Sequence, residues 1–144
     1  DTHANNHEFQ YARAATLDEA FSALVSQLQA RGLWDKTIVV CAGEFGRTPK
    51  INPLGGRDHW PHGFSIAVGG GSFRRGYVHG GTGTEITEES STKTGHVDKP
   101  LDVPDFHASL LHALGIDGSL ELQTPIGRPL TLSSGKPVLE LFDS

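Results

Sequence analysis

The pattern of apolar positions predicts a helix over residues 16–32. Thr16 is expected to cap its first turn, with Glu19 three residues later completing a capping box. Gly32 is placed to end the helix. Apolar side chains recur at helical spacing and are expected to form a buried face: Leu17, Phe21, Leu24, Val25 and Leu28.

Two short apolar runs after this helix predict strands. Residues 37–43 are rich in β-branched side chains without alternation, which is typical of a parallel strand buried on both faces. Residues 64–71 predict a second strand that ends in a glycine turn. A helix, a short turn and a buried strand form the repeating unit of an α/β fold. We therefore expect residues 1–144 to form a single domain with a parallel sheet flanked by helices.

A second helix is predicted over residues 102–115. Asp102 is its expected cap and Gly115 its expected end. His107 and His112 lie away from the apolar stripe, so we expect them on a solvated face. The expected buried face consists of Phe106, Leu110, Leu111 and Leu114.

The remaining segments predict less regular structure. Residues 76–85 are expected to form a short edge hairpin, and the polar residues 83–100 are expected to be mobile. Residues 127–144 are expected to form a packed but irregular closing segment.

Composition excludes several classes of protein. Charged residues make up 20% of the chain and hydrophobic residues 36%, so neither a disordered protein nor a membrane protein is indicated. The formal charge of −5, without a basic stripe, argues against nucleic-acid binding. No apolar run approaches the ~20 residues that span a bilayer. The single Cys41 lies in an apolar run and is expected to be a small buried hydrophobe.

The loop over residues 43–63 concentrates side chains that can carry chemistry. It follows a predicted strand directly, and ligands of open α/β sheets bind beyond the carboxyl ends of strands. Glu44 stands at this rim, and the planar fork of Arg47 suits a phosphate or sulfate ester. The alternative is a Glu44–Arg47 ion pair that stiffens the turn. We expect the loop to fold back so that Glu44, Arg47, Asp58 and His59 share one rim.

Two clusters in the sequence offer metal ligands. Asp58, His59 and His62 lie within five residues, although both histidines could instead bond loop carbonyls. Asp1 and His3 flank one residue, so in an extended chain both point the same way. An oxygen and an imidazole nitrogen suit a divalent cation such as zinc. A chance pairing near the terminus is the alternative.

Several segments together resemble one known family. "DTHANN", "CAGEFGRTPKIN", "GRDHWP", "DFHASLLHALGID" and "GKPVLEL" are similar to the C-terminal portion of the bacterial domain-of-unknown-function 1501 family. That family is similar to the alkaline phosphatase and sulfatase superfamily. The resemblance implies an alkaline-phosphatase-like core, with metals bound at the carboxyl ends of strands.

The resemblance also implies roles for individual residues. Asp1, His3 and His59 would hold one metal ion. Glu44 stands where an acid usually reaches a second metal, although the wider superfamily has Asp followed by His there. The superfamily's nucleophile lies on a preceding strand that this chain lacks. Because the sequence starts without Met, we expect it to be a piece of a longer protein, one that is periplasmic or secreted, and inactive on its own.

The sequence therefore predicts the metal-binding part of a phosphatase-like or sulfatase-like ester hydrolase. Arg47 and Glu44 are the candidate catalytic residues. The cofactor is a divalent metal, with zinc favoured over manganese or calcium, and the substrate is a small anionic ester. A non-catalytic binding or surface module is the alternative. The candidate metal ligands are Asp1, His3, Glu44, Asp58, His59 and His62.

Overall fold

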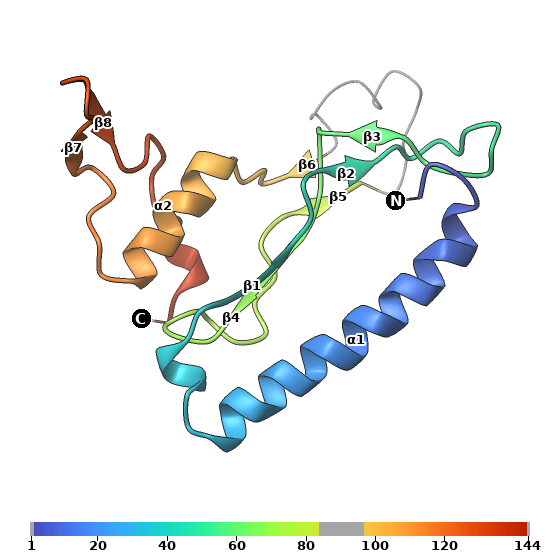
Figure 1. The fold of residues 1–144 in the computed structure, drawn as a ribbon, viewed down its shortest axis with the longest axis horizontal. Coiled ribbons are helices and arrows are strands. Elements are labelled where there is room, and N and C mark those ends of the chain that lie inside the picture. Colours follow the sequence, from blue (N-terminus) through green and yellow to red (C-terminus); the bar gives the residue numbers. More distant parts are fainter. Residues whose placement is uncertain (1, 84–96, 144) are drawn as a thin grey trace.

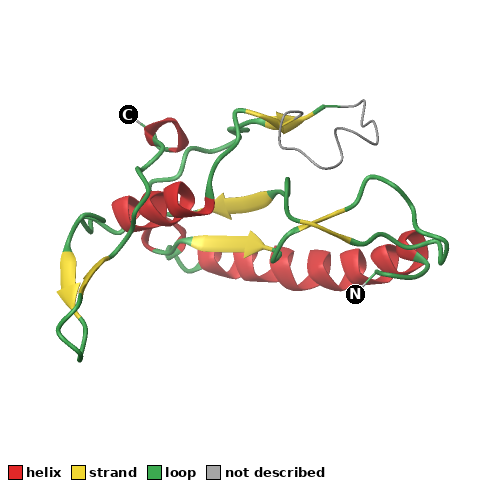
Figure 2. Ribbon diagram, turned by 90° about the horizontal axis from the view of Figure 1, so that it is seen from above, coloured by secondary structure: helices red, strands yellow, loops and turns green. Residues whose placement is uncertain are grey.

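The computed structural model describes residues 2–83 and 97–143 as a mixture of helices and four small antiparallel sheets (Figures 1 and 2). Each sheet has two strands, and the β1–β4 sheet lies between the two α-helices in Figure 1. The elements in chain order are α1 (Asn6–Ala30), η1 (Trp34–Lys36), β1 (Val39–Ala42), β2 (Gly46–Arg47), β3 (His59–Trp60), β4 (Ile66–Gly69), β5 (Gly81–Thr82), β6 (Val97–Asp98), α2 (Val103–Ala113), β7 (Glu121–Gln123), β8 (Pro129–Thr131) and η3 (Leu139–Leu141).

Helix α1 begins at Asn6, well before the predicted start, so the capping box was wrong. Thr16 lies inside the helix, where its hydroxyl donates a hydrogen bond to the Ala12 carbonyl oxygen at 3.2 Å. Residues 6–15 contain neither glycine nor proline, so nothing in them stops a helix. The predicted end is confirmed, because Gly32 adopts a φ of 63° just after the last turn.

The apolar face predicted for α1 is not buried by the described part of the chain. Leu17 is 53% exposed and Leu24 is 47% exposed, while Phe21, Val25 and Leu28 are half-buried. The helix runs along one side of the molecule and contacts η1 at its C-terminal end (Figure 1). Helical periodicity shows which side of a helix is apolar but not what covers that side. In the described part of the chain, neither α-helix combines the length and apolar character needed to cross a membrane.

The expected parallel sheet is wrong, because β1 pairs antiparallel with β4. Val39 lies opposite Gly69, and Ala42 lies opposite Ile66. Burial on both faces is also wrong, since Val40 is 41% exposed. A continuous apolar run predicts a strand, but it does not encode the direction of the neighbouring strand. Cys41, in the same strand, is a free thiol and only half-buried.

The hairpin expected within residues 76–85 is replaced by a longer-range pairing. Strand β5 pairs antiparallel with β6, with Gly81 opposite Asp98. Most of the segment that we expected to be mobile, residues 84–96, lies outside the described residues. A local turn pattern such as "HGGTG" therefore gave the position of one strand but not its partner.

Helix α2 agrees with its prediction at both ends and differs in its buried face. Asp102 occupies the N-cap position, and Gly115 has a φ of 72° after the last turn. Ala108 and Ser109 are the buried residues, whereas Leu114 is 61% exposed and was wrongly expected inside. Small side chains are buried there because residues 133–138 pack directly on this face of the helix.

The start of the closing segment is more regular than predicted, because β8 pairs with β7, which lies just before the segment, to form a hairpin. Leu122 lies opposite Leu130, and Gly127 at a φ of 76° makes the turn. Thr124 closes the turn through hydrogen bonds of its hydroxyl with the backbone of Arg128. The pattern "TPIG" carries turn residues, so this hairpin had a signal in the sequence.

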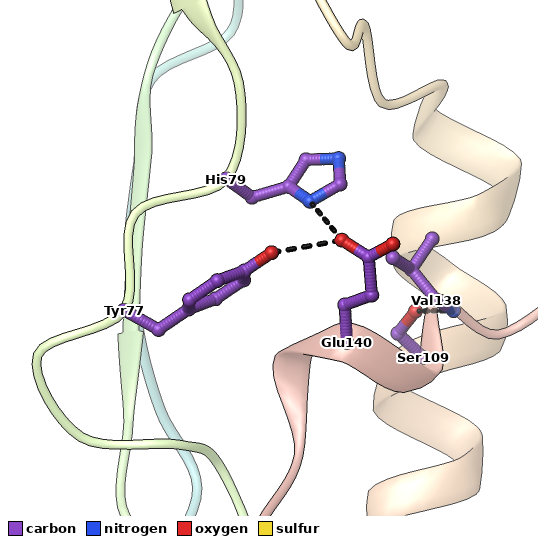
Figure 3. Close-up of polar contacts among 5 residues, drawn as sticks. All are labelled: Tyr77, His79, Ser109, Val138 and Glu140. Atoms are coloured by element: carbon purple, nitrogen blue, oxygen red, sulfur yellow. Dashed lines mark hydrogen bonds and ion pairs between the residues drawn. The ribbon is translucent and has the colours of Figure 1, made fainter.

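Polar contacts link residues 138–140 to α2 and to residues 77–79 (Figure 3). The Val138 backbone N–H donates to the Ser109 hydroxyl at 2.9 Å. The Tyr77 hydroxyl donates to Glu140 Oε2 at 2.8 Å, and the Nδ1 atom of His79 lies 3.8 Å from the same oxygen. The hydrogen bond raises the pKa of Tyr77 and, with nearby Lys99, lowers the pKa of Glu140. The pair is therefore held best with a neutral phenol and an ionised carboxylate.

Replacing Tyr77 with Phe should lower the thermal unfolding midpoint in a pH-dependent way. The lowered pKa of Glu140 stabilises the fold above the ordinary carboxyl pKa of about 4.3, and the raised pKa of Tyr77 stabilises it below about 10. The difference from the wild type should thus be largest near neutral pH. It should shrink below about pH 4 and above about pH 10. Tyr11→Phe, on the exposed surface of α1, is the control; a pH-independent difference would contradict the assignment.

Candidate functional site

The loop over residues 43–63 contains a short antiparallel ladder that places two candidate residues side by side. In the pairing of β2 with β3, Arg47 lies directly opposite His59 and Gly46 lies opposite Trp60. Directly opposite residues project from the same face of a ladder, with their Cβ atoms about 5 Å apart. Arg47 is half-buried, His59 is exposed, and Trp60 is buried on the other face.

His3 joins this pair from the segment that precedes α1. Its ring centroid lies 4.7 Å from that of His59, with the rings tilted by 54°. The Nη1 atom of Arg47 lies 3.2 Å from Nε2 and 3.5 Å from Nδ1 of His3. Phe45 also contacts His59, at a centroid distance of 4.3 Å. We call His3, Arg47 and His59 the His–Arg cluster.

Close backbone contact brings the N-terminal segment to the loop. The Arg57 N–H donates to the Thr2 carbonyl oxygen at 3.0 Å, and the Asn6 N–H donates to the Gly55 carbonyl oxygen at 2.9 Å. Gly56 is buried between them, where a Cβ atom would collide with the His3 carbonyl. The loop needs glycine at this position because the two backbones touch there.

Asp58 is held by neighbours within the loop. Its Oδ1 atom accepts a hydrogen bond from Asn52 Nδ2 at 2.9 Å. Its N–H donates to the Thr48 hydroxyl at 3.0 Å. The carboxylate therefore has a defined orientation beside His59, although the residue is exposed.

Arg57 and Asn52 are structural members of the site that the sequence reasoning missed. The Arg57 guanidinium donates to the backbone carbonyl oxygens of Arg47 and Thr48, which ties the two sides of the loop together. Its carbonyl oxygen in turn accepts from Arg47 Nη1 at 3.3 Å. For Asn52, the pattern "NPLGG" carried a turn signal, since asparagine side chains bond to backbone N–H groups two residues on.

The other predicted ligands are distributed around the loop. Glu44 is exposed at the bend between β1 and β2, and the half-buried ring of His62 lies 6.0 Å from that of Trp60. Asp1 lies outside the described residues. Within the described part of the chain, no group of three or more His, Cys, Asp or Glu side chains is arranged to hold a metal ion.

The family model "Protein of unknown function (DUF1501)" matches residues 1–142. The chain belongs to the DUF1501 family. The match covers the whole of the His–Arg cluster and the segments that hold it in this DUF1501 protein. No curated protein and no solved structure matches the chain.

The cluster of this DUF1501 protein combines one fixed positive charge with two imidazoles. Arg47 is a donor only, so its contact with His3 is a hydrogen bond only when the ring nitrogen carries a lone pair. An unprotonated imidazole can equally donate that lone pair to a metal ion, and a guanidinium binds oxyanions in a bidentate manner. The arrangement therefore suits a cation at the histidines and an anion at the arginine.

Replacing Gly56 with Ala should loosen the contact between the N-terminal segment and the loop. The added methyl group would overlap the His3 carbonyl, and such overpacking costs about 1–3 kcal/mol. Urea denaturation should show this loss. Gly81→Ala is the control, because nothing lies within 4 Å of a Cβ atom at Gly81. Equal stability of the two variants would contradict the close approach.

Proposed function

We propose that the His–Arg cluster is part of a metal-dependent site for a small anionic ester, in a protein similar to alkaline phosphatases and sulfatases. In this proposal His3 and His59 hold a divalent ion, with zinc favoured over manganese or calcium, and Arg47 binds the anionic group. The observation that carries the proposal is the convergence of two imidazoles and a guanidinium from three separate segments of the chain.

The spacing of the two histidines fits a shared metal ion. A nitrogen ligand lies about 2.0–2.1 Å from zinc, so two rings on one tetrahedral ion have centroids about 5 Å apart. The centroids of His3 and His59 are 4.7 Å apart. Asp58 precedes His59 and is the nearest carboxylate in sequence, and Asp1 is the further carboxylate implied by family resemblance. The donor set of nitrogen and carboxylate oxygen is one that zinc accepts.

The charge of Arg47 supports an anionic substrate. A guanidinium beside a divalent cation is repelled unless an anion lies between them. A phosphate or sulfate ester supplies such an anion, with oxygens that match the fork of Arg47. Arg47 would then hold the ester in place and stabilise the negative charge that develops during its cleavage. A bound metal ion would supply Lewis-acid polarisation of an ester oxygen.

His59→Ala should weaken zinc binding by about tenfold or more, because it removes one of two imidazole ligands. Equilibrium dialysis followed by elemental analysis measures this affinity. His107→Ala is the matched control, since His107 is an exposed histidine on α2. Absence of zinc, manganese and calcium binding by the wild-type protein would overturn the metal part of the proposal.

Methylphosphonate, a stable mimic of an anionic ester, should bind more tightly when zinc is present. By linkage, zinc should also bind more tightly in the presence of the phosphonate. Replacing Arg47 with Gln should weaken this coupling, and Arg47→Lys should restore only part of it because lysine lacks the planar fork. Calorimetric titrations measure both affinities. Zinc binding without any coupling would favour the alternative, a non-catalytic binding module.

A further inference from the structure

The side-chain amide of Asn52 links the N-terminal segment, which carries His3, to the strand end that carries His59. Its Nδ2 atom donates to the His3 carbonyl oxygen at 3.0 Å and to Asp58 Oδ1 at 2.9 Å. The first bond holds the N-terminal segment that carries one histidine. The second holds the residue directly before the other histidine, His59.

The acceptor side of the same amide organises the turn of the loop. Oδ1 of Asn52 accepts hydrogen bonds from the N–H groups of Leu54 at 3.0 Å and Gly56 at 2.9 Å. An asparagine amide has two donor hydrogens and one oxygen with two lone pairs, and all four are used here. This full set of partners fixes the orientation of the amide, with nitrogen toward the acceptors and oxygen toward the N–H groups.

We infer that Asn52 is a positioning residue that sets the separation of His3 and His59. Neighbouring backbone bonds hold residues on either side of His3, through Thr2 and Asn6. The Asn52 side chain adds a different kind of link, because one planar amide bonds to both the His3 carbonyl oxygen and the residue next to His59. The inference deepens the proposed function and rests on it for the role of the histidine pair as metal ligands.

The chemistry of the position favours asparagine over similar side chains. An aspartate would keep both bonds to Leu54 and Gly56 but would place an acceptor against the His3 carbonyl and the Asp58 carboxylate. A carboxylate at position 52 would lie next to the Asp58 carboxylate, and the two negative charges would repel each other. A serine can still accept a bond from the N–H two residues on, as in related turns, but cannot reach both acceptors.

Asn52→Asp and Asn52→Ser test the inference together, because both keep an acceptor for the turn and only one adds charge. Two measurements are made well below the unfolding midpoint of each variant. One is the nuclear Overhauser effect between the ring protons of His3 and His59, which needs no metal. The other is zinc affinity by equilibrium dialysis.

Both variants should show a severalfold weaker ring-to-ring Overhauser effect and a loss of about tenfold in zinc affinity. Gln29→Glu, which adds a charge on the exposed surface of α1, should change neither. Variants that unfold more easily but keep the Overhauser effect and the zinc affinity would show a merely structural role and overturn the inference. If the wild type binds no metal, the proposed function fails, and the Overhauser measurement still decides whether Asn52 positions the histidines.

Discussion

The site depends on the backbone contact between residues 2–6 and residues 54–57. Hydrogen bonds link these segments at both ends, and an isolated bridge joins Ala4 to Gly55. The contact is possible because Gly56 presents no side chain to the His3 carbonyl. Two segments that are far apart in sequence are thereby held at van der Waals distance without a large hydrophobic core. The convergence of His3 with Arg47 and His59 follows from this one contact.

The rest of the fold explains why this backbone contact is needed. Few apolar side chains of the described residues are buried: Val39, Trp60, Phe73, Ala108 and Leu141. Hydrogen-bonded turns and pairs therefore fix local geometry that packing alone would leave loose. Within the loop, Asn52 and Arg57 use nearly all of their polar atoms on backbone or side-chain partners. Hydrogen bonds between neighbouring segments, rather than a packed core, therefore maintain the shape of the site.

The sequence predicted elements well where the signal was local. Glycines at positions 32 and 115 and the cap at Asp102 marked helix ends because each acts through its own backbone conformation. The start of α1 was misplaced because a capping pattern also occurs by chance inside a helix, at Thr16. The predicted strand direction was wrong because strand pairing is not a local property. The antiparallel pairing of β1 with β4 depends on where the chain returns after the loop, and no residue in either strand encodes that.

The candidate site was only partly predictable for the same physical reason. Residue types and spacing drew attention to Arg47, His59 and His3, and the family resemblance grouped His3 with His59. Neither could assign Asn52, because its role comes from a distance between two segments rather than from its own chemistry. The pattern "NPLGG" is typical of a turn in which the asparagine oxygen accepts bonds from nearby N–H groups. The bonds of its nitrogen reach across the fold, so they become visible only in three dimensions.

The contact between Arg47 and His3 couples the proposed metal ligand to the proposed anion-binding residue. Nη1 of Arg47 lies within 3.5 Å of both ring nitrogens of His3, and in a neutral ring one of these carries the lone pair that a metal ion would use. A guanidinium and a metal ion cannot share one lone pair, so Arg47 must turn away from His3 when that nitrogen becomes a ligand. Its remaining bond to the Arg57 carbonyl oxygen keeps it at the rim of the ladder. The released N–H of Nη1 would then be available to an incoming oxyanion, which gives a physical reason for metal and anion to bind in a coupled way.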